Sequence, residues 1–187
     1  MEGVTRRFLR HLNHFTLFNL NGIVLNWEYP VTEPHPRERR LVLRLLDYWR
    51  QMADDRDLPL PEAVDPAAIP DMWTFCFMID DPKSAPRLSF VGDYHKEMYG
   101  GDPTGLAFHE VKKDTLLGRS MSYLGDVLAK GVPVTYGNQF VDMAGRGLLY
   151  RSILLPLSAD GKTISVVLGG ANCRILGHDE VVENPQP

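Results

Sequence analysis

Residues 87–105, with the sequence RLSFVGDYHKEMYGGDPTG, constrain the fold of this chain more than any other segment. Residues 88–91 are typical of a short strand, and the strand ends at Gly92. Asp93 is a candidate N-cap for a short helix, which Gly100-Gly101 brings to an end. A further turn follows. This alternation of a strand, a short helix and turns indicates a domain that mixes helices and strands.

The composition excludes several functional classes. The chain has 187 residues and a net charge of −4, which argues against general affinity for nucleic acid because phosphate binding depends on clustered Lys and Arg. Cys76 and Cys173 lie far apart in apolar runs and are expected to be free thiols in a reducing compartment. No apolar run reaches the length of a membrane span. A cytoplasmic protein is expected.

The first 35 residues form an N-terminal extension whose structure is ambiguous. Residues 5–10 are similar to a twin-arginine export signal, but the following run is too polar and lacks a cleavage site. Residues 8–18 could form a basic helix. Residues 15–20 and 23–29 could equally form a hairpin around Asn21-Gly22. Either structure carries apolar surface that the main domain or a second chain must cover, so this segment is a candidate for packing or homodimerisation.

A helix is predicted over residues 36–52, followed by a polar linker that ends at residue 62. Pro36 suits the first position of the helix. The apolar side chains recur at helical spacing on one stripe: Leu41, Leu45, Tyr48, Trp49 and Met52. The stripe predicts that one side of this helix is buried.

Residues 63–177 are expected to form the main domain. Asp65 and Pro66 begin a short helix, and residues 73–79 are a buried strand. A long helix is predicted over 114–130 because Gly131 and Pro133 follow it. Three strands close the domain, and their short connections predict antiparallel hairpins; they cover residues 133–143, 148–157 and 164–175. The acidic tail, residues 178–187, is predicted to be flexible.

This order of elements resembles the PAS domain, which has a five-stranded antiparallel sheet with helices over one face. Short motifs strengthen the resemblance to a divergent branch of small, single-domain alphaproteobacterial PAS-like proteins. They are the stretch 45–49 leading into Asp65-Pro66, then Val91-Gly92, the turn 99–105 and the stretch 155–161. The resemblance covers about residues 40–176 and predicts an α+β fold, to which the extension and the helix 36–52 are added.

The resemblance implies a sensory or regulatory module that has no catalytic activity. PAS domains bind small molecules between the sheet and the helices, or they act as dimerisation and docking surfaces. Two functions therefore remain open. The chain senses a small molecule and signals through an unidentified partner protein, or it is a ligand-free adaptor that forms homodimers through the N-terminal segment and the helix 36–52.

Flavin, haem and metal ions are each disfavoured as cofactors, so the cofactor is left unknown. Residues 170–176 are similar to the cysteine motif of flavin-binding photosensory PAS domains. In that family the motif lies on a helix after the second strand, whereas here it lies at the end of the last predicted strand. A haem would need an axial histidine, for which His95 and His109 are the candidates by position. His95 is expected to face solvent in part, beside Lys96 and Glu97. His11 and His14 lack a nearby third zinc ligand.

No catalytic residues can be assigned, because no serine has a nucleophile-elbow setting and no glycine loop suits a phosphate. Strand alternation puts Arg151 on the more apolar face of its strand, where a buried arginine would need a carboxylate or a ligand. The short helix is expected to face the same cavity. The predicted ligand-binding residues are therefore Tyr94, Met98, Tyr99, Arg151 and Ile153. In the alternative interpretation they only fill the core.

Overall fold

A computed structural model describes residues 18–20, 23–25 and 36–177, with side chains described from residue 41. The helices are α1 (Pro36–Ala53), α2 (Pro70–Trp73), α3 (Asp93–Tyr99), α4 (Leu116–Met121) and α5 (Leu124–Lys130). The strands are β1 (Phe18–Leu20), β2 (Ile23–Leu25), β3 (Cys76–Asp80), β4 (Arg87–Val91), β5 (Val134–Val141), β6 (Gly147–Leu157) and β7 (Val166–Ile175). Three short 3₁₀ turns are η1 (Pro61–Ala63), η2 (Pro66–Ala68) and η3 (Phe108–Glu110).

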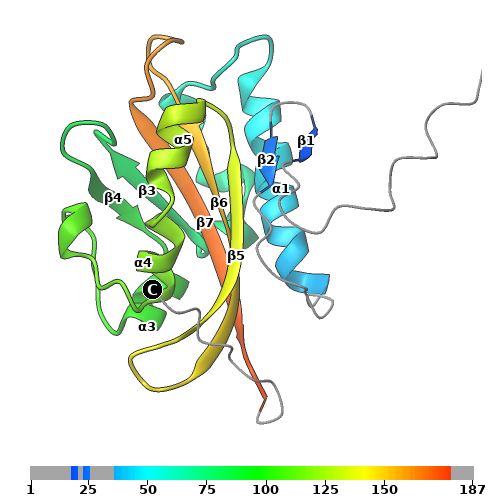
Figure 1. The fold of residues 1–187 in the computed structure, drawn as a ribbon. Helices are drawn as coiled ribbons and strands as arrows, with labels where there is room; N and C mark the ends of the chain where they lie inside the picture. Colours follow the sequence, from blue (N-terminus) through cyan, green and yellow to red (C-terminus); the bar gives the residue numbers. More distant parts are fainter. Residues whose placement is uncertain (1–17, 21–22, 26–35, 178–187) are drawn as a thin grey trace, which may run out of the picture.

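The strands form one sheet in the order β1-β2-β5-β6-β7-β3-β4 (Figure 1). The five strands from β5 to β4 pair antiparallel, which confirms the predicted five-stranded sheet. The described part of the N-terminal extension adds β1 and β2 as an antiparallel pair, so here the hairpin alternative holds. Strand β2 joins the sheet by parallel pairing to β5, with Val24 opposite Val134 and Leu25 opposite Thr135.

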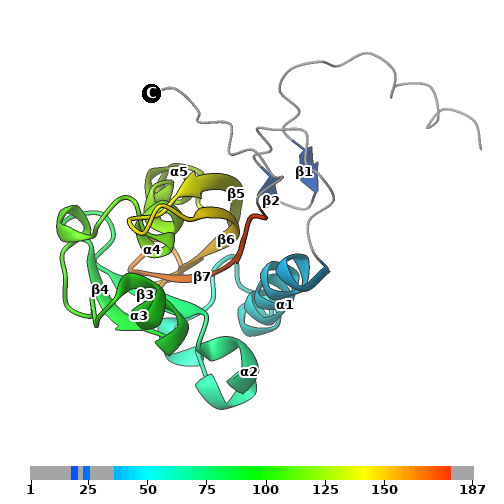
Figure 2. The same cartoon turned by 90° about the horizontal axis from the view of Figure 1, so that it is seen from below.

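Helices cover both faces of the sheet (Figures 1 and 2). Ser152 faces α4 and α5, because its hydroxyl accepts a hydrogen bond from Tyr123, which lies between these two helices. Ile153, the next residue of β6, is paired with Gly170, against which Leu45 of α1 packs. Successive residues of a strand point to opposite faces. Helices α3, α4 and α5 therefore cover one face, as predicted, and α1 covers the other.

The predicted stripe of α1 is confirmed as its buried side. Leu41, Leu45, Tyr48 and Trp49 are each at most 9% exposed, and Met52 packs against the same core. The indole N–H of Trp49 donates a hydrogen bond to the carbonyl oxygen of Pro156 on β6 (2.8 Å). This bond satisfies a polar group that burial would otherwise leave unpaired. Helix α1 and the sheet share one hydrophobic core.

Two adjacent glycines of β7 let side chains pack closely on both faces of this strand. A Cβ atom at Gly169 would overlap the ring of Phe77, and a Cβ atom at Gly170 would overlap Leu45. Phe77 and Leu45 lie on opposite faces and are fully buried. Close approach of this kind is a common reason for glycine within a strand. At the pair Gly169-Gly170, Phe77 of the neighbouring strand β3 therefore covers one face of β7, and Leu45 of α1 covers the other.

The single helix predicted over residues 114–130 is wrong in one respect, because the structure divides it. Helix α4 ends at Met121 and α5 begins at Leu124, with Tyr123 out of helical geometry at φ −102° and ψ 21°. The break turns the Tyr123 side chain into the core, where its hydroxyl donates to Ser152 (2.9 Å). A continuous amphipathic stripe did not reveal this, because tertiary packing overrides helix propensity at Tyr123.

Several predictions fall on other parts of the chain. The basic helix proposed over 8–18 lies outside the described residues except for Phe18, which is in β1. Also outside them lie the export-like residues 5–10, the Asn21-Gly22 turn, the pair His11 and His14, and the tail 178–187. Among residues 18–20, 23–25 and 36–177, no helix combines the length and the apolar character that a bilayer span requires.

Candidate ligand site between the sheet and helices α3 and α4

Helix α3 is fixed against the sheet by its first residues. Gly92 precedes the helix, and a Cβ atom there would overlap the backbone of Thr74. The Tyr94 N–H donates to the carbonyl and hydroxyl oxygens of Thr74. The residue before the helix is therefore Gly92, and the predicted N-cap Asp93 is instead the first helical residue. Gly100 ends the helix at φ 77°, a left-handed conformation that favours glycine.

His95 is the central polar residue beneath α3. Its side chain is fully buried, so the expectation that it faces solvent is wrong. Nε2 lies 2.9 Å from the carbonyl oxygen of Phe75, which can only accept, so Nε2 carries the proton. Nδ1 is then an acceptor, and it has no hydrogen-bond partner within the described part of the chain. Burial lowers the pKa of His95 to about 4, so the ring is neutral at pH 7.

Burial of His95 follows from its helical position, although the polar residues beside it in the sequence suggest exposure. His95 lies three and four residues before Met98 and Tyr99, so the three share one side of α3. Lys96 and Glu97 point elsewhere and are half-buried and exposed, respectively. These two polar neighbours, which suggested that His95 faces solvent, therefore lie on other sides of the helix.

An apolar cluster lies beside His95, and we call it the α3–α4 cluster. Its buried members are Leu116, Phe140, Leu148, Tyr150 and Ala171, and its partly buried members are Tyr94, Met98, Tyr136 and Cys173. The Tyr94 hydroxyl ties α3 to the end of β7, because it accepts a hydrogen bond from the Cys173 N–H (3.3 Å) and lies 3.4 Å from the Cys173 sulfur. The cluster joins two helices to the three central strands.

Aromatic rings fill much of the space beneath the helices. Phe77 packs edge-on against His95, with ring centroids 5.3 Å apart. Tyr123, Tyr136 and Tyr150 follow one another across the sheet, with centroid separations of 5.5 and 6.4 Å. Burial raises the pKa of the Tyr123 and Tyr150 hydroxyls. These phenols are therefore neutral hydrogen-bonding groups.

The five predicted ligand residues do not lie together. Tyr94 and Met98 belong to the α3–α4 cluster. Tyr99 lies at the edge of the main core, where its hydroxyl accepts the N–H of Lys112. Arg151 and Ile153 are on the opposite face of the sheet, under α1, because β6 alternates. The structure thus brings Tyr94 and Met98 together and separates them from Arg151 and Ile153.

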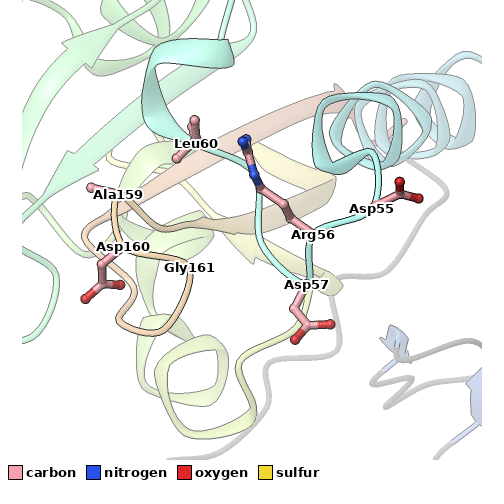
Figure 3. Close-up of a pocket in the computed structure, with 7 residues that line it drawn as sticks. All are labelled: Asp55, Arg56, Asp57, Leu60, Ala159, Asp160 and Gly161. Atoms are coloured by element: carbon pink, nitrogen blue, oxygen red, sulfur yellow. The ribbon is translucent and has the colours of Figure 1, made fainter.

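Two surface depressions lie away from this region. One has a volume of about 470 Å³ and lies between α1 and the turns η1 and η2, lined among others by Tyr48, Met52 and Ile69. The other, of about 490 Å³, lies between the loop after α1 and the turn that joins β6 to β7 (Figure 3). Asp55, Asp57 and Asp160 line the second one. Asp160 accepts the N–H groups of its own turn, which lower the pKa of its carboxyl group, so its role is structural.

The chain belongs to the PAS domain family. The family model of the PAS domain matches residues 37–171, which is more than half of the chain. No curated protein matches its sequence. A PAS domain of this size fits a sensory or regulatory module, and PAS domains are generally non-catalytic.

Solved structures with a similar chain path are distant in sequence. The PAS domain of BvgS from Bordetella pertussis is 13% identical, with 52% of this chain and 70% of that chain covered and a TM-score of 0.36. A LOV protein from Rhodobacter sphaeroides is 13% identical, with 60% and 69% covered and a TM-score of 0.41. The LOV domain of the blue-light activated histidine kinase EL346 from Erythrobacter litoralis is 13% identical, with 54% and 95% covered and a TM-score of 0.41.

The cysteine motif that is similar to those of flavin photosensors lies where the sequence placed it. Asn172, Cys173 and Arg174 are on β7, the last strand of the sheet. Cys173 is half-buried beside the Tyr94 hydroxyl. Its sulfur therefore belongs to the contact between α3 and β7.

Proposed function

We propose that this PAS domain binds a small molecule between the sheet and helices α3 and α4, and that it signals through a partner protein. The observation that carries this proposal is the unpaired Nδ1 of the buried His95. A buried acceptor without a donor is costly, so such groups usually mark water, a ligand or strain. A ligand with an O–H or N–H group would supply the missing donor.

In this proposal Tyr94 and Met98 form the wall of the site, and Tyr99 borders it. Tyr94 packs edge-on against His95, with ring centroids 5.9 Å apart. Met98 is half-buried, and an unbranched thioether side chain adapts its shape to a bound molecule at little cost. Arg151 and Ile153, on the opposite face, are not part of this site.

The nitrogen chemical shifts of His95 test the proposal directly. We expect the Nδ1 resonance of ¹⁵N-histidine-labelled protein to move when the low-molecular-weight fraction of a cell extract is added, because Nδ1 then accepts a hydrogen bond. The exposed His109 is the internal control and should not move. An unchanged His95 resonance at saturating extract would contradict ligand binding at this site.

A second candidate function is a ligand-free adaptor that forms homodimers, and the filled core favours it. Phe77, Tyr150 and Met121 are each at most 2% exposed beneath the helices. The apolar stripe of α1 is already buried against the sheet, so a dimer would use the N-terminal segment or the outward side of α1, where Leu43 is 57% exposed. Light scattering on the full chain and on a variant without residues 1–30 tests this function. If the full chain is a dimer and the variant without residues 1–30 is a monomer, the adaptor function is supported. If the full chain is a monomer, the adaptor function is excluded.

We also infer a cytoplasmic, non-catalytic protein from the alphaproteobacterial branch of single-domain PAS proteins. The motif order described above and the two free thiols, Cys76 and Cys173, support this inference. Localisation of a tagged full-length chain by cell fractionation tests the compartment, and recovery in the periplasmic fraction would contradict it.

A further inference from the structure

Arg119 of α4 extends over the edge of the α3–α4 cluster. Its guanidinium carbon lies 5.6 Å from the centroid of the Phe140 ring, and Phe140 packs edge-on against Tyr150 at 5.5 Å. Burial raises the pKa of the Tyr150 hydroxyl, and the positive charge of Arg119 has a smaller effect in the opposite direction. An arginine, an aromatic ring and a phenol hydroxyl therefore meet at this edge of the cluster.

One donor of Arg119 is buried and lacks an acceptor. Nη2 donates to the Asp114 carboxylate at 2.7 Å, an ion pair whose side chains are 43% and 63% exposed. Nε is buried and has no hydrogen-bond partner among the described residues. The unpaired Nε is the second unsatisfied polar atom beside the cluster, after Nδ1 of His95, and it requires an acceptor.

The charge around Arg119 favours an anionic acceptor. The loop before α4 carries Lys112, Lys113 and Asp114, so together with Arg119 this segment has three positive charges and one negative charge. This loop is held against α4, because a Cβ atom at Gly118 would overlap the Lys112 carbonyl oxygen and the Thr115 hydroxyl caps the helix. The backbone of this loop is therefore held against the turn of α4 that carries Arg119, while Nζ of Lys112 lies over the Tyr99 ring, 4.9 Å from its centroid.

We propose that Arg119 and Tyr150 bind the carboxylate group of a small molecule, with one carboxylate oxygen on Nε and the other on the Tyr150 hydroxyl. Arginine and carboxylate form charge-assisted hydrogen bonds of matching geometry. A monoanion suits the site better than a dianionic phosphate, because Asp114 already occupies Nη2. This ligand class rests on the proposed function, since the rest of the molecule would extend over the cluster towards Met98 and Tyr94.

Benzoate is a suitable probe, because it joins a carboxylate to an aromatic body, and benzamide is its neutral counterpart. Both are titrated into the full-length protein while the Arg119 Nε–H signal is followed by nuclear magnetic resonance. We expect a saturable shift with benzoate. The affinity for benzamide should be lower by about tenfold or more, since a hydrogen bond between charged groups is lost.

Arg119→Gln removes the charged donor, and Arg146→Gln is the control, because Arg146, whose side chain is 45% exposed, also pairs with an aspartate at 2.7 Å, Asp142 in the β5–β6 turn. Circular dichroism verifies that both variants fold. Benzoate binding should fall about tenfold in R119Q and persist in R146Q. The proposal is overturned if benzoate gives no saturable shift, if benzamide binds equally well, or if R119Q binds benzoate like the wild type.

The ligand site beneath α3 and the carboxylate contact at Arg119 can be rejected separately. A His95 resonance that responds to extract while benzoate gives no shift at Arg119 would reject the carboxylate and keep the proposed site. A His95 resonance that does not respond, together with benzoate binding at Arg119, would confine the ligand to the outer edge of the cluster and reject the site beneath α3.

Discussion

His95 Nε2 lies 2.9 Å from the carbonyl oxygen of Phe75, and this bond joins the first turn of α3 to the segment that leads into β3. The same carbonyl oxygen accepts the N–H of Ala171 on β7. A single backbone oxygen thus connects α3 with the centre of the sheet. The neutral imidazole fills this position without burying a charge.

Burial of neutral His95 makes the stability of the fold depend on pH. Unfolded histidine takes up a proton near pH 6.5, whereas folded His95 does so only near pH 4. The unfolded state therefore binds more protons between these values, and stability falls as the pH drops from about 6.5 to about 4. The loss reaches about 3 kcal/mol at the lower end, since each unit of pKa difference corresponds to about 1.4 kcal/mol.

Urea unfolding at several pH values tests this dependence. His95→Gln, which removes the titrating ring, should flatten the profile between pH 4 and 6.5. His109→Gln is the control on an exposed histidine and should retain the slope of the wild type. Equal slopes in the wild type and H95Q would contradict a buried, neutral His95.

The close approach at the two glycines of β7 predicts unequal costs of substitution. Gly169→Ala places a methyl group against the rigid Phe77 ring, and Gly170→Ala places one against the flexible end of Leu45. Overpacking costs about 1–3 kcal/mol, and we expect G169A at the upper end and G170A at the lower end. Phe77→Leu should recover part of the G169A loss, which urea unfolding measures. A G169A protein as stable as the wild type would show that Phe77 does not rest on β7.

The contact of α1 with β6 depends on Trp49. Trp49→Phe removes the donor to the Pro156 carbonyl oxygen inside the core, so it should lower the free energy of unfolding by about 2 kcal/mol. Trp73→Phe is the matched control. Trp73 is half-buried and stacks on Phe90, with centroids 4.3 Å apart, and a phenyl ring can still stack there. If both variants lose the same stability, the hydrogen bond to Pro156 is not what holds α1.

The strand and helix order could be read from local signals in the sequence. Turn residues, helix stops such as Gly131 and the stripe of α1 define elements independently of the rest of the fold. The break at Tyr123 and the pairing of β2 with β5 could not be read, because both arise from contacts between residues far apart in the chain. The spacing of apolar residues along a helix or strand depends on neighbouring residues and does not reveal contacts between distant ones.

The sequence named two residues of the proposed site, Tyr94 and Met98, from their place on the short helix. Strand alternation correctly put Arg151 and Ile153 on one face of β6, but it is not the face that the short helix covers. Strand alternation alone does not show which face of the sheet the short helix covers. That assignment depends on the crossing of α1 behind the sheet, where Leu45 meets Gly170.

The most direct test of ligand binding is whether the purified protein retains a small molecule beneath α3. Immobilised full-length protein is incubated with metabolite extract and washed, and it is then denatured to release bound compounds for mass spectrometry. Met98→Trp fills the α3–α4 cluster, and Leu43→Trp adds the same bulk on the exposed side of α1 as a control. We expect a specific metabolite to be retained by the wild type and by L43W and lost from M98W. No metabolite retained by the wild type, or equal retention by all three proteins, would contradict it.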